Sequence, residues 1–515
     1  MNEKKKGGIL TSAAVMGIII LASKLLGLFR DILVARFYGM STEAIAYSAA
    51  SRIPVTIFDL VIGGVVTSAF IPVFNSVLVK KGKNDAMRFA NSYMNFILLV
   101  CTTIAALGVI LAPQAVSLIA PDITSEARGL AIDLTRIMFP MIIFTGLAFS
   151  FVGILQSMGE YNLPAVISLV SNLIMVTYLF TLNRFFGVVG LSVAMLLGWA
   201  AQAGIQVPKV RSFGFRYRPT LKIFDPTLMR AAKNALPILI GTWTTPICTL
   251  INSRFASGIE EGRGVTAIDY ANRLYIMIVG IFSFVATNLL FPYFSRAEAE
   301  GDREGATRMI RTSVKVLVYI IAPIAVGIMA LSTPFTALVY ERGEFVRADT
   351  LLTSEALSRF AVGMIFMAAN EVIVKALFAA EKPKIPMISS LVSMGVNVAV
   401  VTVFGTSLGV GGIALVSALA TALNLAINVF VAHRRGICRF VWADVFDFIK
   451  SLVSAGAMVP VILVISSHIG NPVFKIVLCV ASAAPVYFIV STVLRSEESK
   501  FVINTVKSKL LHKEA

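Results

Sequence analysis

Charge is scarce in this chain: only 14% of its 515 residues are Asp, Glu, Lys or Arg, whereas 57% are hydrophobic. A soluble domain carries roughly 25% charged residues, and the mean hydropathy of this chain is +0.84. Apolar runs of membrane length, about 20 residues each, fill almost the whole sequence. The composition therefore excludes an ordinary soluble protein and predicts an all-α polytopic membrane protein.

Residues that carry catalytic or metal chemistry are also few. The chain has 4 cysteines and 3 histidines, and no cysteine pair has the CxxC spacing of a metal or redox site. The HExxH and GxxxxGKS/T motifs are absent, which argues against a metalloprotease and a P-loop ATPase. We therefore expect a protein that is not an enzyme and has no cofactor and no metal site. The cysteines are interpreted as small apolar core residues.

Apolar runs separated by polar loops predict about fourteen transmembrane helices. Their expected limits are 9–38, 44–78, 88–112, 127–157, 163–183, 187–208, 228–257, 264–295, 306–331, 351–380, 384–404, 410–432, 447–467 and 472–494. Lysine and arginine gather in alternate loops, and the formal net charge is +17. The positive-inside rule places these loops and both termini in the cytoplasm. Because the basic clusters fall between apolar spans, we attribute them to topology and expect no nucleic-acid partner.

The sequence also repeats itself with a period of roughly 220 residues. The matching pairs are Ala50–Ile53 with Ala271–Leu274, Phe70–Phe74 with Leu290–Phe294, Tyr161–Pro164 with Pro383–Pro386, and Gly187–Gly190 with Gly409–Gly412. Each repeat holds six predicted spans, so both have the same orientation, and cargo is expected between them. The predicted domains are an N-lobe at 1–222, a C-lobe at 223–440, two extra spans at 441–496 and a basic cytoplasmic tail at 497–515.

Several charged residues lie inside the predicted spans. A charge at mid-bilayer is costly and usually faces a protein interior or a wet cavity. The cations that we expect to bind substrate are Lys24, Arg30, Arg52 and Arg273. The acids that we expect to line the cavity or hold a coupling ion are Asp31, Asp59, Asp269 and Glu371. Arg52 and Arg273 occupy corresponding places in the two repeats, so a cationic cavity for an anionic cargo is predicted.

Structural pairing is the alternative role for these charges. Asp269 with Arg273, and Glu371 with Lys375, have the i,i+4 spacing at which opposite charges neutralise each other on a helix. Arg30 and Asp31 can likewise pair with neighbouring helices. Residues that permit bending lie close to the charges and are candidate hinges, namely Gly27, Pro54, Gly63 and Gly64.

Ser23–Gly39, Ser68–Pro72 and Tyr270–Leu274 resemble segments of the MurJ (MviN) family of bacterial lipid II flippases, and Leu331–Phe345 is similar to its external loop before helix ten. The resemblance implies the multidrug/oligosaccharidyl-lipid/polysaccharide exporter fold. That fold has two six-helix lobes and two further helices that form a groove for the lipid tail, which accounts for residues 441–496. The family's cavity cations correspond to Lys24, Arg30 and Arg273. This chain lacks the family's arginine pair in helix two, and Arg52 is expected to substitute for it.

The resemblance implies a flippase for undecaprenyl-pyrophosphate-linked peptidoglycan precursor, lipid II. It would work by alternating access in the bacterial plasma membrane, as a monomer, with the membrane potential or an unknown coupling cation as the driving force. A flippase for another lipid-linked glycan remains an alternative. A cation-coupled multidrug antiporter of the same superfamily is a second one, although a cavity for cationic drugs should be acidic rather than basic.

Overall fold

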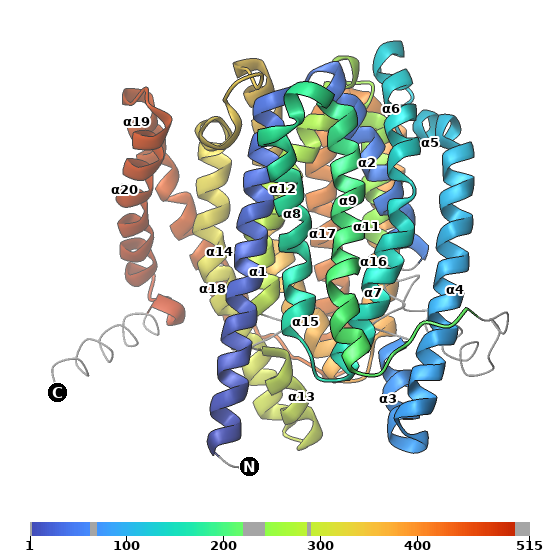
Figure 1. The fold of residues 1–515 in the computed structure, drawn as a ribbon. Coiled ribbons are helices and arrows are strands. Elements are labelled where there is room, and N and C mark those ends of the chain that lie inside the picture. The colour runs from blue at the N-terminus through green and yellow to red at the C-terminus, as the bar shows by residue number, and fades with distance from the viewer. Residues whose placement is uncertain (1–2, 62–69, 220–242, 286–289, 500–515) are drawn as a thin grey trace. The chain divides into compact units, whose positions relative to one another are not determined.

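The computed structural model describes residues 3–61, 70–219, 243–285 and 290–499, and all regular secondary structure in these ranges is helical (Figure 1). This confirms the all-α class. The chain divides into two compact units, residues 1–266 and 267–515, each of which is described by itself. The candidate hinges Gly63 and Gly64 lie outside the described residues, as does most of the basic tail.

The described part of the first unit is built from helices. They are α1 (Glu3–Tyr38), α2 (Thr42–Val61), α3 (Ile71–Lys81), α4 (Lys83–Ile110), α5 (Ala112–Ile119), α6 (Ser125–Met138), α7 (Met141–Ser157), α8 (Asn162–Thr181), α9 (Asn183–Ser212) and α11 (Thr244–Ala256). Local chemistry sets several ends. The Thr124 side chain accepts a hydrogen bond from Ala127 N and so caps α6, and Gly187, at φ 51°, kinks the start of α9.

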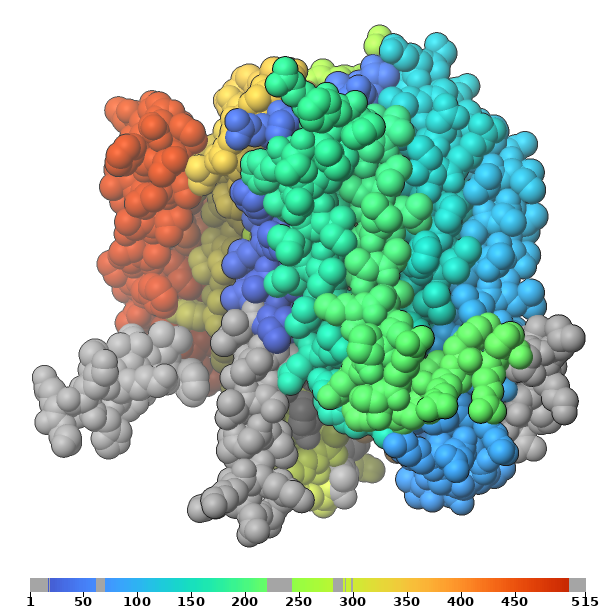
Figure 2. Space-filling model, viewed as in Figure 1, coloured from blue at the N-terminus to red at the C-terminus, as the bar shows by residue number. Residues whose placement is uncertain are grey.

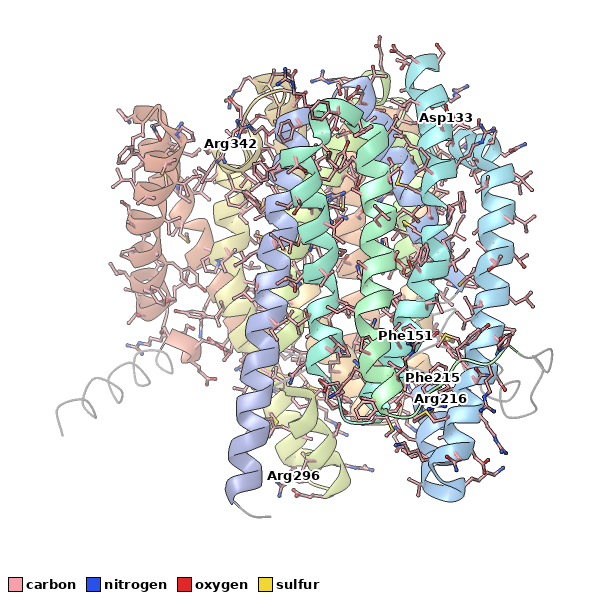
Figure 3. All side chains as sticks on the ribbon, in the orientation of Figure 1. Asp133, Phe151, Phe215, Arg216, Arg296 and Arg342 are labelled. Carbon is pink, nitrogen blue, oxygen red and sulfur yellow. The ribbon has the colours of Figure 1, made fainter. Side chains whose placement is uncertain are left out.

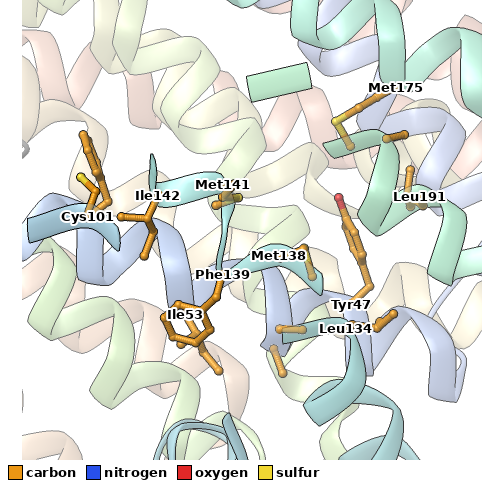
Figure 4. Close-up of a cluster of buried hydrophobic side chains, with 14 of the residues drawn as sticks. Tyr47, Ile53, Cys101, Leu134, Met138, Phe139, Met141, Ile142, Met175 and Leu191 are labelled. Carbon is orange, nitrogen blue, oxygen red and sulfur yellow. The ribbon is translucent and has the colours of Figure 1, made fainter. Parts of the chain in front are cut away.

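Close helix packing forms the core of the first unit (Figure 4). A Cβ at Gly108 would lie 2.0 Å from the Phe139 ring, and one at Gly146 would lie 2.6 Å from Cys101 Sγ. Glycine is therefore needed where α4 meets the junction of α6 and α7. Cys101 is fully buried there, as expected of a small core residue.

The second unit begins within α12 (Arg263–Val285). Its other helices are α13 (Phe291–Ala299), α14 (Arg303–Tyr340), α15 (Arg347–Ala379), α16 (Lys384–Phe404), α17 (Gly409–Arg434), α18 (Trp442–Gly456), α19 (Met458–His468) and α20 (Pro472–Val493). The ninth span was predicted to end at residue 331, and the helix is kinked at that residue. Leu331 leaves helical geometry, with φ −109° and ψ 18°, but α14 continues through Pro334 to Tyr340. The apolar residues after Pro334 allow the helix to resume after a local distortion.

Ten stretches of the described residues are long and apolar enough to cross a membrane. Two of them join helices that the sequence predicted as one span each, Ser125–Ser157 (α6 and α7) and Trp442–His468 (α18 and α19). The stretch Lys384–Arg434 is 51 residues long and contains α16 and α17. The multi-pass architecture is thereby confirmed. The number of fourteen spans and the lobe boundaries stay predictions.

Candidate functional site

Arg30, on α1, is held by two neighbours. Its Nε and Nη2 donate to Asp31 Oδ1 at 3.0 and 2.7 Å, and its Nη1 donates to Asn172 Oδ1 on α8 at 2.9 Å. The Arg30 side chain is 23% exposed and that of Asp31 is 9% exposed. The guanidinium therefore has a fixed direction and a nearby counter-charge, and the side chain is only partly buried.

Asn172 is the part of this arrangement that sequence reasoning missed. It is buried, and its Nδ2 donates to the Ser23 carbonyl oxygen of α1 at 3.2 Å. A Cβ at Gly27 would lie 3.3 Å from the same Nδ2. Gly27 thus allows α8 to approach α1 closely, and α1 passes through it as one helix. A lone asparagine in an apolar span was the signal that was available.

Lys24 and Arg52 are both partly buried. Arg52 Nη1, on α2, donates to Ser253 Oγ on α11. Arg30 and Arg52 therefore reach toward different helices, α8 and α11. Two residues after Arg52, α2 continues through Pro54 to Val61, and Trp243 Nε1 donates to the Leu60 carbonyl at 2.6 Å. The candidate hinge Pro54 thus lies inside a continuous helix in this structure.

The candidate acids differ in exposure. Asp31 is buried and Asp59 is exposed on α2, whereas Asp269 and Glu371 in the second unit are partly buried. Arg273 is also partly buried, one turn after Asp269 on α12. Between them, Tyr270 packs against Tyr340 and Phe345 with ring centroids 4.9 and 5.5 Å apart, which fixes this part of α12.

An ionic cluster in the second unit was not predicted. Arg311 donates from Nε and Nη2 to the two oxygens of Asp444 at 2.7 and 2.8 Å. Lys315 Nζ lies 3.1 Å from Asp444, 2.8 Å from Asp447 and 3.1 Å from Glu497. This cluster links α14 to the start of α18 and to the segment after α20. The sequence did contain a signal for this cluster. Two cations are spaced i,i+4 near the start of one predicted span, and two acids are spaced i,i+3 near the start of another.

The second unit also contains an apolar groove. It encloses about 750 Å³ between α12, α14, α19 and α20. Its walls include Pro323, Gly327, Phe335, Met458, Ala483 and Phe488. A Cβ at Gly327 would meet no atom within 4 Å, so the groove is open at that point. A cavity with only apolar walls suits a hydrocarbon chain.

The described residues of α1, α2 and α12 supply positively charged side chains that can bind an anion. Partly buried guanidinium groups form short, strong hydrogen bonds with phosphate oxygens, often in pairs. Within the described residues no group of three or more His, Cys, Asp or Glu side chains could hold a metal ion.

Comparison with known proteins places the chain among transporters. A family model described as "Lipid II flippase MurJ" matches residues 34–483. A probable lipid II flippase MurJ from Rhizobium tropici is 27% identical over 510 residues, which are 95% of each chain. One from Buchnera aphidicola subsp. Schizaphis graminum is 26% identical over 455 residues, which are 87% of each chain. The family match begins after Lys24 and Arg30. The assignment of these two residues to the site therefore rests on geometry and on the resemblance of α1.

Solved structures show the same fold. A lipid II flippase MurJ in an inward closed conformation superposes with a TM-score of 0.81 at 24% identity, covering 93% of this chain and 98% of that chain. A multidrug resistance MATE family transporter in an inward-facing conformation has a TM-score of 0.67 at 17% identity, covering 82% of this chain and 98% of that chain. The two proteins are a lipid II flippase and a multidrug transporter, and the similarity of this chain to both is one of architecture.

Proposed function

The chain belongs to the lipid II flippase MurJ family, and from this membership we infer that it moves lipid II across the bacterial inner membrane. Lipid II is a peptidoglycan precursor carried on undecaprenyl pyrophosphate, and the direction of transport is from the cytoplasmic to the outer leaflet. The observation that carries this function is the family match over residues 34–483, supported by relatives of the same name along nearly the whole chain.

The pyrophosphate of the substrate is the group that the interior cations would bind. We assign this role to Lys24, Arg30 and Arg52 of the first unit together with Arg273 of the second. Arg30 supports the assignment because Asp31 and Asn172 fix its direction while 23% of its side chain stays exposed. Convergence of the cations from both units on one phosphorylated head group is part of the proposal.

The undecaprenyl chain would lie in the apolar groove of the second unit. The groove is formed in part by α19 and α20, which belong to the two extra spans at 441–496. Hydrocarbon placed there avoids water, while the sugar–peptide head group stays in the wet interior. The two parts of the substrate thus have separate sites of matching polarity.

Transport would proceed by alternating access of the two lobes in a monomer whose termini both lie in the cytoplasm. Gly27, Pro54, Gly63 and Gly64 are the proposed hinges. Outward movement of negative charge follows an inside-negative membrane potential, which is worth about 2.3 kcal/mol per charge per 100 mV. Asp31, Asp59, Asp269 or Glu371 would hold a coupling cation if one is used.

Complementation of a lipid II flippase depletion strain tests the function. The unaltered gene is expected to restore growth, and Arg30→Ala and Arg273→Ala are expected to abolish rescue at equal membrane abundance. Arg136→Ala is the matched control, because that arginine is exposed and pairs with Asp133 at 3.4 Å. Failure of the unaltered gene would point to a flippase for another lipid-linked glycan. Full rescue by both cavity variants would remove the proposed pyrophosphate site.

A further inference from the structure

A second cavity lies in the first unit, between α4, α7 and the end of α9. It encloses about 750 Å³, and its inner wall is formed by Met94, Leu98, Leu147 and Phe151. None of the proposed pyrophosphate ligands lines it. A volume of about 300–1,000 Å³ is typical of a site for a small-molecule ligand.

The segment after α9 closes the cavity on one side and is firmly attached to α4. Asn91 Nδ2 donates to the Arg218 carbonyl at 2.6 Å, and Arg218 N donates back to Asn91 Oδ1 at 2.8 Å. Tyr217 Oη donates to Asn95 Oδ1 at 2.9 Å. In Figure 2 this green segment runs along the end of the unit toward the blue helices. The cavity is therefore a built feature rather than a gap beside a loose loop.

The apolar half of the cavity continues into this segment. Phe215 is 3% exposed, and its ring packs edge-to-face on Phe151 with centroids 6.4 Å apart. Figure 3 shows Phe151, Phe215 and Arg216 next to one another. The apolar wall and the guanidinium group of the site are thus supplied by neighbouring residues, Phe215 and Arg216.

The polar half of the cavity is cationic. Arg211, in the last turn of α9, and Arg216 both line it, and both are exposed. Lys83 Nζ comes 3.9 Å from the position of a Cβ on Gly214. Lys209 is paired with Glu160 at 3.4 Å, but along the described chain no ion pair is formed by Arg211 or Arg216. Two arginines at the mouth of an apolar cavity leave positive charge available to a ligand.

We propose that this cavity binds an anionic phospholipid of the adjacent leaflet, with the phosphate between Arg211 and Arg216 and an acyl chain along Met94, Leu98, Leu147 and Phe151. Basic pockets between transmembrane helices on the cytoplasmic side recognise lipid head groups in this way. A soluble anion would use the arginines and leave the apolar wall empty, whereas a neutral lipid would use the wall and leave the arginines unpaired. The site is separate from the proposed transport path.

Native mass spectrometry of the full-length protein in mixed micelles tests the proposal. The probes are phosphatidylglycerol and phosphatidylcholine with identical acyl chains. The unaltered protein should retain one phosphatidylglycerol at least fivefold more tightly than phosphatidylcholine, and the Arg211→Ala/Arg216→Ala variant should lose this preference. Arg434→Ala/Arg435→Ala removes the same charge from exposed arginines at the end of α17 and should keep the preference. Rescue of the depletion strain by both double variants verifies folding.

Three results would overturn the site. They are equal retention of the two lipids by the unaltered protein, an unchanged preference in the Arg211→Ala/Arg216→Ala variant, and an equal loss in the Arg434→Ala/Arg435→Ala variant. A further arm adds glycerol phosphate at millimolar concentration, which should leave the bound phosphatidylglycerol in place. Its displacement would show an anion site without an acyl-chain contribution and would also contradict the proposal.

Discussion

Arg30 has five N–H donors, and three of its hydrogen bonds go to Asp31 and Asn172. Arg30 Nη1 also lies 3.9 Å from Met175 Sδ, and 23% of the side chain is exposed. Asp31 offsets the charge, and Asn172 fixes the direction without reducing the charge. Asn172 therefore acts through Arg30 as a positioning residue, because it also binds the backbone of α1 at Ser23.

Asn172→Ala should reduce flipping. A hydrogen bond to a charged group is worth about 1.5–3 kcal/mol, and each 1.4 kcal/mol corresponds to about tenfold, so we expect a loss of roughly ten- to a hundredfold. The measurement is the rate at which lipid II reaches the outer leaflet in depleted cells. Ser171→Ala, next to it on α8, is the control and should leave the rate unchanged. Normal rates with Asn172→Ala would show that Arg30 needs no such support.

At the scale of elements, the ionic cluster fixes the start of α18 and the segment after α20 to α14. Asp444 is 0% and Asp447 6% exposed, and Lys315, 11% exposed, is shared between them. Loss of the shared cation leaves Asp444 with Arg311 and Asp447 with Lys450, so it should cost less than the roughly 3–5 kcal/mol of a buried charge that loses its last partner. An exposed pair such as Arg296–Glu300, 78% and 58% exposed, contributes about 0–1 kcal/mol.

Lys315→Ala should therefore lower the thermal unfolding midpoint in detergent by several degrees, whereas Arg296→Ala should not change it. Asp447→Ala added to Lys315→Ala should recover part of the loss, because one of the two buried acids that have lost a cation is removed. Equal midpoints for Lys315→Ala and the unaltered protein would show that the cluster does not hold these helices together.

The groove beside α14 allows a second test at this scale. Gly327→Phe should place a ring in the groove, since a Cβ at this position meets no atom within 4 Å. We expect it to abolish rescue of the depletion strain at normal abundance. Gly395→Phe is the matched control, because Gly395 also has open space around it but lies on α16, outside the groove. Rescue by Gly327→Phe would exclude the groove as the site of the lipid tail.

For the whole molecule, hydropathy predicted the helical class and the joined spans α6–α7 and α18–α19, because burial in lipid demands long apolar helices. The residues that pair with individual charged side chains could not be predicted from the sequence. Arg311 and Asp444 are 133 residues apart, and Arg30 and Asn172 are 142 apart. One sequence carries no signal that links such distant positions. The predicted end of the ninth span at residue 331 coincides with the kink at Leu331, whereas the helical residues from Pro334 to Tyr340 were not predicted.

The predicted topology can be checked by labelling introduced cysteines with a membrane-impermeant maleimide. Ser407→Cys should label in intact cells, and Arg435→Cys should label only after permeabilisation, because only Arg435 lies in a basic loop. Burial raises the pKa of the Cys438 thiol to about 12, so at neutral pH it has little reactive thiolate and should give little background. The reverse pattern of labelling would invert the orientation.

The account depends on interior cations that carry the pyrophosphate of lipid II across the membrane. The most direct measurement is the fraction of lipid II in the outer leaflet of flippase-depleted cells that express this chain. The unaltered protein should restore that fraction, and Arg30→Ala and Arg273→Ala should each leave lipid II in the inner leaflet at normal protein abundance. Full restoration by the two variants would contradict the account.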